Sequence, residues 1–129
     1  MAVLDRLIAA RRWDIHRDPH EGAGALDAYL EDTGAGLMWL AARALGAPQA
    51  AEGAVRNYGW AVAAAGYLRA VPELMARGRQ PLPIRAQDLA RVGLEKLGAA
   101  RKARRSVPTA VAPALLAGWQ TGAILRQVL

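Results

Sequence analysis

Residues 68–83, LRAVPELMARGRQPLP, carry most of the information about the fold of this chain. The residues just before them, GWAVAAAGYL at 59–68, are uncharged, which predicts a helix that is buried on most sides. Pro72 is expected to kink or end that helix, because proline lacks a backbone donor and clashes with the preceding turn. Gly78 and the two prolines of residues 78–84 then indicate the clearest loop in the chain.

The rest of the chain also favours helices. Alanine-rich segments carry apolar residues at spacings of three and four, without sustained β-branched alternation. Gly46 followed by Pro48 indicates the end of one helix, and Pro108 suits the first turn of another. We therefore expect a single all-α domain over residues 1–129, a bundle of about five helices. These helices are expected over residues 3–13, 25–45, from 49 through 68, 86–105 and 108–127.

The composition limits the chemistry and the location of the protein. There are no cysteines, which excludes disulfides and thiolate metal sites. The N-terminal residues MAVLDRLIAARRWD lack a long apolar core and do not form a secretory signal. We expect a cytoplasmic protein, either free or peripheral to the inner membrane.

The chain is basic, with 17 lysines and arginines against 11 acidic residues and a net charge of +6. Most of the cations are arginine, as in proteins from GC-rich bacterial genomes. Nucleic acid, an anionic membrane surface and an acidic ligand would each suit this charge. The one dense cluster is Arg101, Lys102, Arg104 and Arg105. It indicates either cations at the negative end of a helix or a small nucleic-acid-binding site.

The uncharged run at residues 107–125 has two interpretations. It is nearly long enough to span a bilayer, and positive charges precede it. Pro113, Gln120 and its small residues instead favour a helix packed closely within a bundle. Trp119 in this run, like Trp39 and Trp60, is expected in the core because apolar residues surround it.

The first stretch resembles the second acidic motif of the squalene and phytoene synthase family, L-R-D-V-x-E-D-x-x-R-G-R-x-Y-L-P. The matching residues are Leu68, Arg69, Val71, Glu73, Arg77, Gly78, Arg79, Leu82 and Pro83. Where the family has its metal-binding aspartates, this chain has Ala70 and Leu74. The family holds the substrate diphosphate through magnesium, and carboxylates one helical turn apart can point at one ion. The resemblance therefore implies the family's fold without this pair of metal ligands.

The loss of polar residues extends upstream. The family pattern G-x-A-x-Q-x-x-N-x-L-R-D places a glutamine and an asparagine beside the diphosphate pocket. Ala63 and Gly66 stand at these positions in GWAVAAAGYLRA. The resemblance thus gives Ala63, Gly66 and Ala70, together with Tyr29, as pocket-lining candidates.

Two further segments extend the resemblance. Residues 29–46, YLEDTGAGLMWLAARALG, are similar to the family's Y-R-V-A-G-T-V-G-L-M segment, with the reactive-site tyrosine falling on Asp27. PALLAGWQTGAILRQ is similar to the family's last helix. The resemblance covers residues 7–127 and corresponds to the C-terminal half of the isoprenoid-synthase-type domain. It places the first aspartate motif upstream of Met1.

The resemblance also supplies candidates for an anion site. Arg69, Arg77 and Arg79 occupy positions that face the diphosphate in active relatives, and Glu73 can pair with an arginine at helical spacing. These four residues are candidates for binding an anion or a diphosphate, and solvated surface arginines are the alternative. We expect no catalytic residue, no metal and no cofactor, with magnesium required only if the chain belongs to an enzyme.

A second pattern suggests a metal site. Asp14 and Asp18 have D-x-x-x-D spacing, and His16 and His20 have the spacing of a zinc pair on a helix. Pro19 disfavours a continuous helix there. We therefore expect a polar turn in which an aspartate caps a helix.

Three functions fit these observations. Degenerate members of the family include a mitochondrial assembly factor for respiratory complex I, and this resemblance implies a non-catalytic, protein-binding or assembly role at the membrane periphery. A prenyl synthase acting on polyprenyl diphosphates, as a fragment or split enzyme, is the first alternative. A small basic nucleic-acid-binding protein is the second. Because two helices are apolar on several faces, we expect a protein partner or self-association.

Overall fold

The computed structural model describes residues 2–12 and 22–129, and this part of the chain contains helices and no strand. The α-helices are α1 (Ala2–Arg11), α2 (Ala23–Leu30), α3 (Gly36–Ala44), α4 (Glu52–Ala76), α5 (Ala86–Lys102), α6 (Ala112–Leu115) and α7 (Thr121–Val128). The π-helical segment η2 (Glu31–Ala35) joins α2 to α3 without a break. The all-α bundle predicted from the sequence is confirmed.

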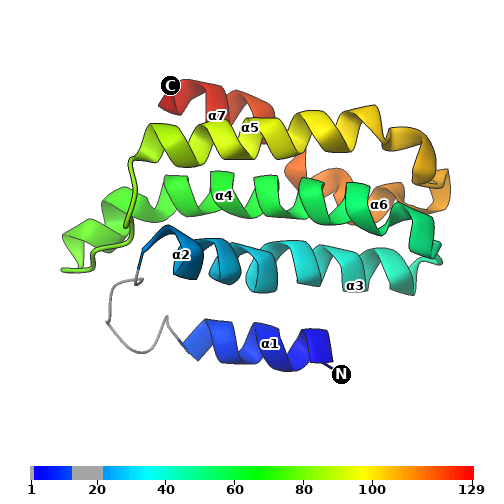
Figure 1. Cartoon of the computed structure of the whole chain (residues 1–129), viewed down its shortest axis with the longest axis horizontal. Coiled ribbons are helices and arrows are strands. Elements are labelled where there is room, and N and C mark those ends of the chain that lie inside the picture. Colours follow the sequence, from blue (N-terminus) through cyan, green and yellow to red (C-terminus); the bar gives the residue numbers. More distant parts are fainter. Residues whose placement is uncertain (1, 13–21) are drawn as a thin grey trace.

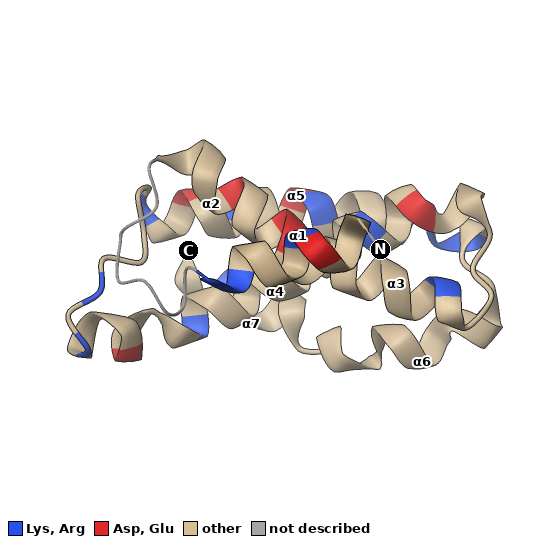
Figure 2. Ribbon diagram, turned by 90° about the horizontal axis from the view of Figure 1, so that it is seen from below, with Lys and Arg blue, Asp and Glu red and all other residues tan. Residues whose placement is uncertain are grey.

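Helix α4 is the centre of the bundle (Figure 1). It packs against the α2–α3 helix on one side and against α5 on the other, while α7 packs on α5 and α4. Helix α1 packs on α3 and η2 and has no buried residue. Its charged residues are seen from below in Figure 2. Helix α4 therefore contacts most of the other elements, as its uncharged stretch at residues 59–68 predicts.

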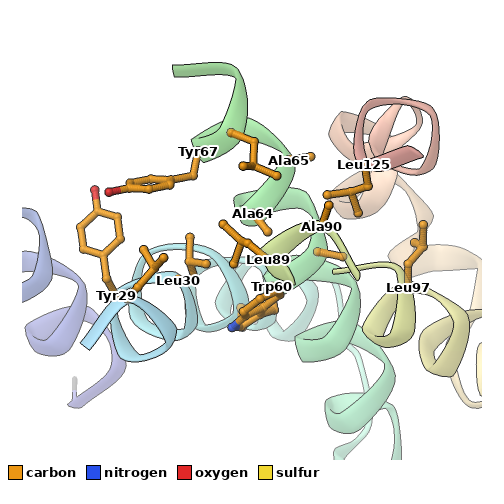
Figure 3. Packing of buried hydrophobic residues seen from close by; sticks show 14 residues of the cluster. Tyr29, Leu30, Trp60, Ala64, Ala65, Tyr67, Leu89, Ala90, Leu97 and Leu125 are labelled. Atoms are coloured by element: carbon orange, nitrogen blue, oxygen red, sulfur yellow. The ribbon is translucent and has the colours of Figure 1, made fainter. Parts of the chain in front are cut away.

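The core lies on both sides of α4. Trp60, Ala64 and Ala65 of this helix pack with residues of α2 and α5 (Figure 3). Near the start of α4, a smaller apolar cluster contains Trp39, Val55 and Val111. Trp39 and Trp60 are buried, as predicted, but Trp119 is 77% exposed. The prediction that Trp119 lies in the core is therefore wrong.

Two glycines follow the ends of helices; the sequence predicts a helix end at the first and a loop beginning at the second. Gly46 follows α3 with φ 91° and Gly78 follows α4 with φ 78°, conformations that side chains disfavour. At the second site the Arg79 N–H donates to the Leu74 carbonyl at 3.0 Å, which satisfies a carbonyl at the helix end. Pro72 does not end α4, because the helix continues through Ala76. Pro72 removes only its own hydrogen bond to the turn before it, and the residues after it still close the last turn of α4.

The helix predicted over residues 108–127 is not continuous. A short 3₁₀ segment precedes α6, and another, Leu116–Gly118, separates α6 from α7. Gly118 lies against Tyr58 and Val62 of α4, and a Cβ on it would come within 2.7 Å of Tyr58 Oη. The Tyr58 hydroxyl donates to the Leu115 carbonyl at 2.9 Å, and burial raises the pKa of this tyrosine. Contacts with α4 therefore bend the chain here, and the expectation of one long helix is wrong.

The membrane-spanning interpretation of the same run is not supported. No helix in the described ranges 2–12 and 22–129 is both long enough and apolar enough to cross a bilayer.

Helix α5 ends at Lys102, three residues before the predicted end, and Arg104–Ser106 forms a 3₁₀ turn.

Candidate functional site

A half-open cavity of about 520 Å³ lies between α4 and the α2–α3 helix. Its lining is mostly apolar. Helix α4 contributes Gly59, Val62, Ala63, Gly66, Tyr67, Ala70 and Leu74, and the facing helix contributes Tyr29, Leu30, Thr33, Gly34, Leu37, Met38 and Ala41, with Arg11 and Ala114 completing the lining. A volume of this size is within the range of small-molecule sites.

Small side chains on one face of α4 leave room for this cavity. Gly59, Ala63, Gly66 and Ala70 follow one another at spacings of four, three and four residues, which places them on a single face of the helix. Leu74 continues the same row by one turn. Larger residues at these positions would fill the space.

Two tyrosines form one wall of the cavity. The rings of Tyr29 and Tyr67 meet edge to face with centroids 5.8 Å apart, as Figure 3 shows. The Tyr67 hydroxyl donates to the Pro81 carbonyl at 2.7 Å and so fixes the loop that follows α4. Arg11 Nη1 lies 3.4 Å from the Tyr29 hydroxyl. Thr33 donates to the Tyr29 carbonyl at 2.7 Å within the π-helical turn.

The pocket-lining candidates from the sequence lie together. Tyr29, Ala63, Gly66 and Ala70 all line this cavity. Leu74, at the second lost aspartate position, lines it as well. Their role in binding a ligand stays a prediction.

The anion-binding candidates lie elsewhere. Arg69 lines a separate hollow against α7, because a rotation of about 100° per residue turns it away from the face of Ala70. Arg77 Nη2 contacts Glu73 Oε1 at 2.6 Å in an exposed ion pair beyond the cavity residues. Arg79 is half-buried on the following loop. None of the four is among the described residues that line the cavity, and their binding of an anion stays a prediction.

A profile of the squalene/phytoene synthase family matches residues 1–121. The chain belongs to this family. No curated protein and no solved structure matches the chain. In this squalene/phytoene synthase family member, the cavity is lined by Ala63, Gly66 and Ala70, the positions at which the family pattern given above has glutamine, asparagine and aspartate.

The cavity residues do not fit a magnesium ion. Magnesium prefers carboxylate oxygens, and no carboxylate is present among the described residues of the lining. In residues 2–12 and 22–129 there is also no group of three or more His, Cys, Asp or Glu that could hold a metal. Asp27, aligned with the family's reactive-site tyrosine, accepts a hydrogen bond from Trp60 Nε1 at 3.0 Å. Asp14, His16, Asp18 and His20 lie outside the described residues.

Sequence reasoning did not identify several cavity residues. Tyr67 follows Ala63 by four residues, so helical spacing alone indicates that it shares this face. Met38 and Thr33 could be identified only by knowing which face of the α2–α3 helix turns toward α4. Arg11 required knowledge of where α1 packs, which no local pattern supplies.

Proposed function

We propose that this protein is a non-catalytic member of the squalene/phytoene synthase family that acts by binding, in an assembly role at the membrane periphery. One observation carries the proposal. Ala63, Gly66, Ala70 and Leu74 stand where the family pattern has glutamine, asparagine and two aspartates, and all four line one cavity. The four positions at which apolar residues or glycine replace the family's polar residues therefore surround one cavity.

The chemistry of ionisation explains why this loss matters. A diphosphate leaves more readily when metal ions neutralise the charge that develops on it. Ala70 and Leu74 provide neither a ligand for such an ion nor a hydrogen bond to the diphosphate. Arg11 is the one charged side chain among the described lining residues, so a single cation is present to offset the cost of moving a charged diphosphate into this cavity. The scaffold remains, and its capacity to stabilise that leaving group is reduced.

A binding role is also supported by apolar side chains on the surface. The exposed large apolar residues include Leu4, Ile8, Leu37, Leu45 and Met75. Contiguous exposed apolar surface often marks a site of interaction. The proposed partner is another protein or a second copy of this chain.

We expect no prenyl synthase activity. Farnesyl or geranylgeranyl diphosphate incubated with the protein and magnesium should release no pyrophosphate above a no-protein blank, because the cavity lacks ligands for the ion. An active synthase of the same family, assayed in parallel, shows that the substrate and the detection are sound. Pyrophosphate release that a chelator abolishes would contradict the proposal.

We further expect association in solution. Light scattering at micromolar concentration should report a dimer or a larger species, because association would cover exposed apolar side chains. A monomer that also fails to bind the dye ANS would show that no apolar face needs a second copy. The proposed partner would then have to be another protein.

A further inference from the structure

The chain presents an uncharged surface at the break between α6 and α7. Leu116 is 67% exposed and Trp119 is 77% exposed. Ala117, Gln120 and Ala123 beside them are also exposed. We call these five residues the Trp119 patch. In Figure 2 the ribbon of α6 and of the segment that follows it carries no charged residue.

The neighbours of the patch explain why it is exposed. Leu115 and Gly118 are fixed to α4, the first through the Tyr58 hydroxyl bond and the second by direct contact with Tyr58 and Val62. Because these contacts turn Gly118 inward, the residues on either side of it face outward. The patch is therefore held in place by the fold and is not a frayed end.

One arginine borders the patch, and two more lie beside Gly122, the residue before Ala123. Arg69 shares a hollow with Trp119, Gln120 and Ala123. On the side of α5, guanidinium nitrogens of Arg126 and Arg101 lie 3.3 and 3.4 Å from the position that a Cβ on Gly122 would occupy. The chain from Lys96 to its last residue contains six lysines and arginines and no aspartate or glutamate. The apolar side chains thus lie within a surface segment whose charges are all positive.

We propose that the Trp119 patch is the surface through which the protein docks onto a membrane that contains anionic lipids. The indole of tryptophan combines an apolar body with a polar N–H and favours the boundary between lipid and water. Arginine stems lie along apolar surface while their guanidinium groups reach the headgroups. The nearby arginines match the negative charge of the headgroups, and Leu116 and Trp119 match the apolar interior of the bilayer. The inference rests on the proposed function for the location of the protein at a membrane, and it names the surface and the lipid charge.

A bilayer fits this patch better than a nucleic acid. Arginines and Trp119 would serve a nucleic acid through phosphate contacts and base stacking. Leu116 would add nothing to such a complex, although it is among the most exposed apolar residues of the described chain. A lipid surface buries Leu116 and Trp119 together.

Vesicle flotation with the full chain tests the proposal. The protein should float with vesicles of phosphatidylcholine and phosphatidylglycerol, should stay unbound with phosphatidylcholine alone, and should be released by high salt. Trp119→Ala and Leu116→Ala should each lower the partition coefficient by about tenfold, the loss expected on removing one large apolar contact. Ile8→Ala is the matched control, since Ile8 is 54% exposed on α1. It should leave binding unchanged, and thermal melts should show all three variants folded.

A second readout places the indole itself. Brominated lipid should quench the fluorescence of the native protein, and Trp119→Phe should float as the native protein does while losing that quenching. Equal flotation of native protein, Trp119→Ala and Leu116→Ala would overturn the proposal, and so would equal binding to neutral vesicles. Retention on an RNA column that Trp119→Ala abolishes, without flotation of the native protein, would reassign the patch to nucleic acid. Pyrophosphate release is measured without vesicles, so failure of the docking surface and failure of the non-catalytic assignment are distinguishable.

Discussion

Replacing Trp60 with alanine is expected to lower the free energy of unfolding by about 3–5 kcal/mol. Trp60 is the largest fully buried side chain among the described residues, at 2% exposure. It connects three elements: its ring packs in the main core from α4, its Nε1–H donates to Asp27 of α2, and Lys96 of α5 lies 5.1 Å from the ring centroid. Alanine would leave a cavity and remove the partner of Asp27.

Urea denaturation monitored by circular dichroism measures this change. Trp119→Ala is a matched control, because the same substitution at a 77% exposed position is expected to change stability by no more than about 0.5 kcal/mol. Trp60→Phe keeps most of the packing and loses the hydrogen bond, so it should have an intermediate effect. Equal losses for the two alanine variants would show that Trp60 is not the centre of the core.

The sequence predicts those parts of the fold whose causes are local. Gly46 ends a helix and Gly78 begins a loop where they were expected, because a positive φ depends on the residue itself. The break at Gly118 depends instead on Tyr58 and Val62, which lie far away in sequence. Residues 108–127 could therefore be assigned as helical, but the interruption and the exposure of Trp119 could not be predicted. Both follow from the way this segment packs on α4.

The residues of the candidate site also fall into those that helical spacing predicts and those that depend on how the helices pack. Ala63, Gly66 and Ala70 share a helical face by their spacing alone, and the structure places them along one cavity. The facing wall depends on which side of the α2–α3 helix packs on α4, and the resemblance supplied only Tyr29 of it. Arg69, a candidate for the anion site, is turned toward α7 by the rotation of about 100° between neighbouring helical residues. Its separation from the face of Ala70 follows from helical geometry alone.

Gly59→Ala and Gly34→Ala are expected to destabilise the protein by about 1–3 kcal/mol each, the range for overpacking. A Cβ on Gly34 would overlap Ala63 Cβ and lie 2.9 Å from the Gly59 carbonyl oxygen. A Cβ on Gly59 would lie 2.9 Å from Ala35 Cα and 3.1 Å from the Gly34 carbonyl oxygen. These neighbours are backbone atoms and a Cβ, which cannot rotate away. The α2–α3 helix and α4 would have to separate at the floor of the cavity.

Gly66→Ala and Gly98→Ala test whether close approach is the cause. Both glycines lie inside helices, α4 and α5, and a Cβ on either would meet nothing within 4 Å. Alanine at these positions should raise stability by about 0.5–1 kcal/mol, because it reduces the backbone entropy that folding must overcome. Opposite signs at Gly59 and Gly66, measured by urea denaturation, would locate the constraint at the helix crossing. A stabilising effect at all four glycines would mean that the crossing is looser than the structure shows, and the cavity between these helices would then have no fixed floor.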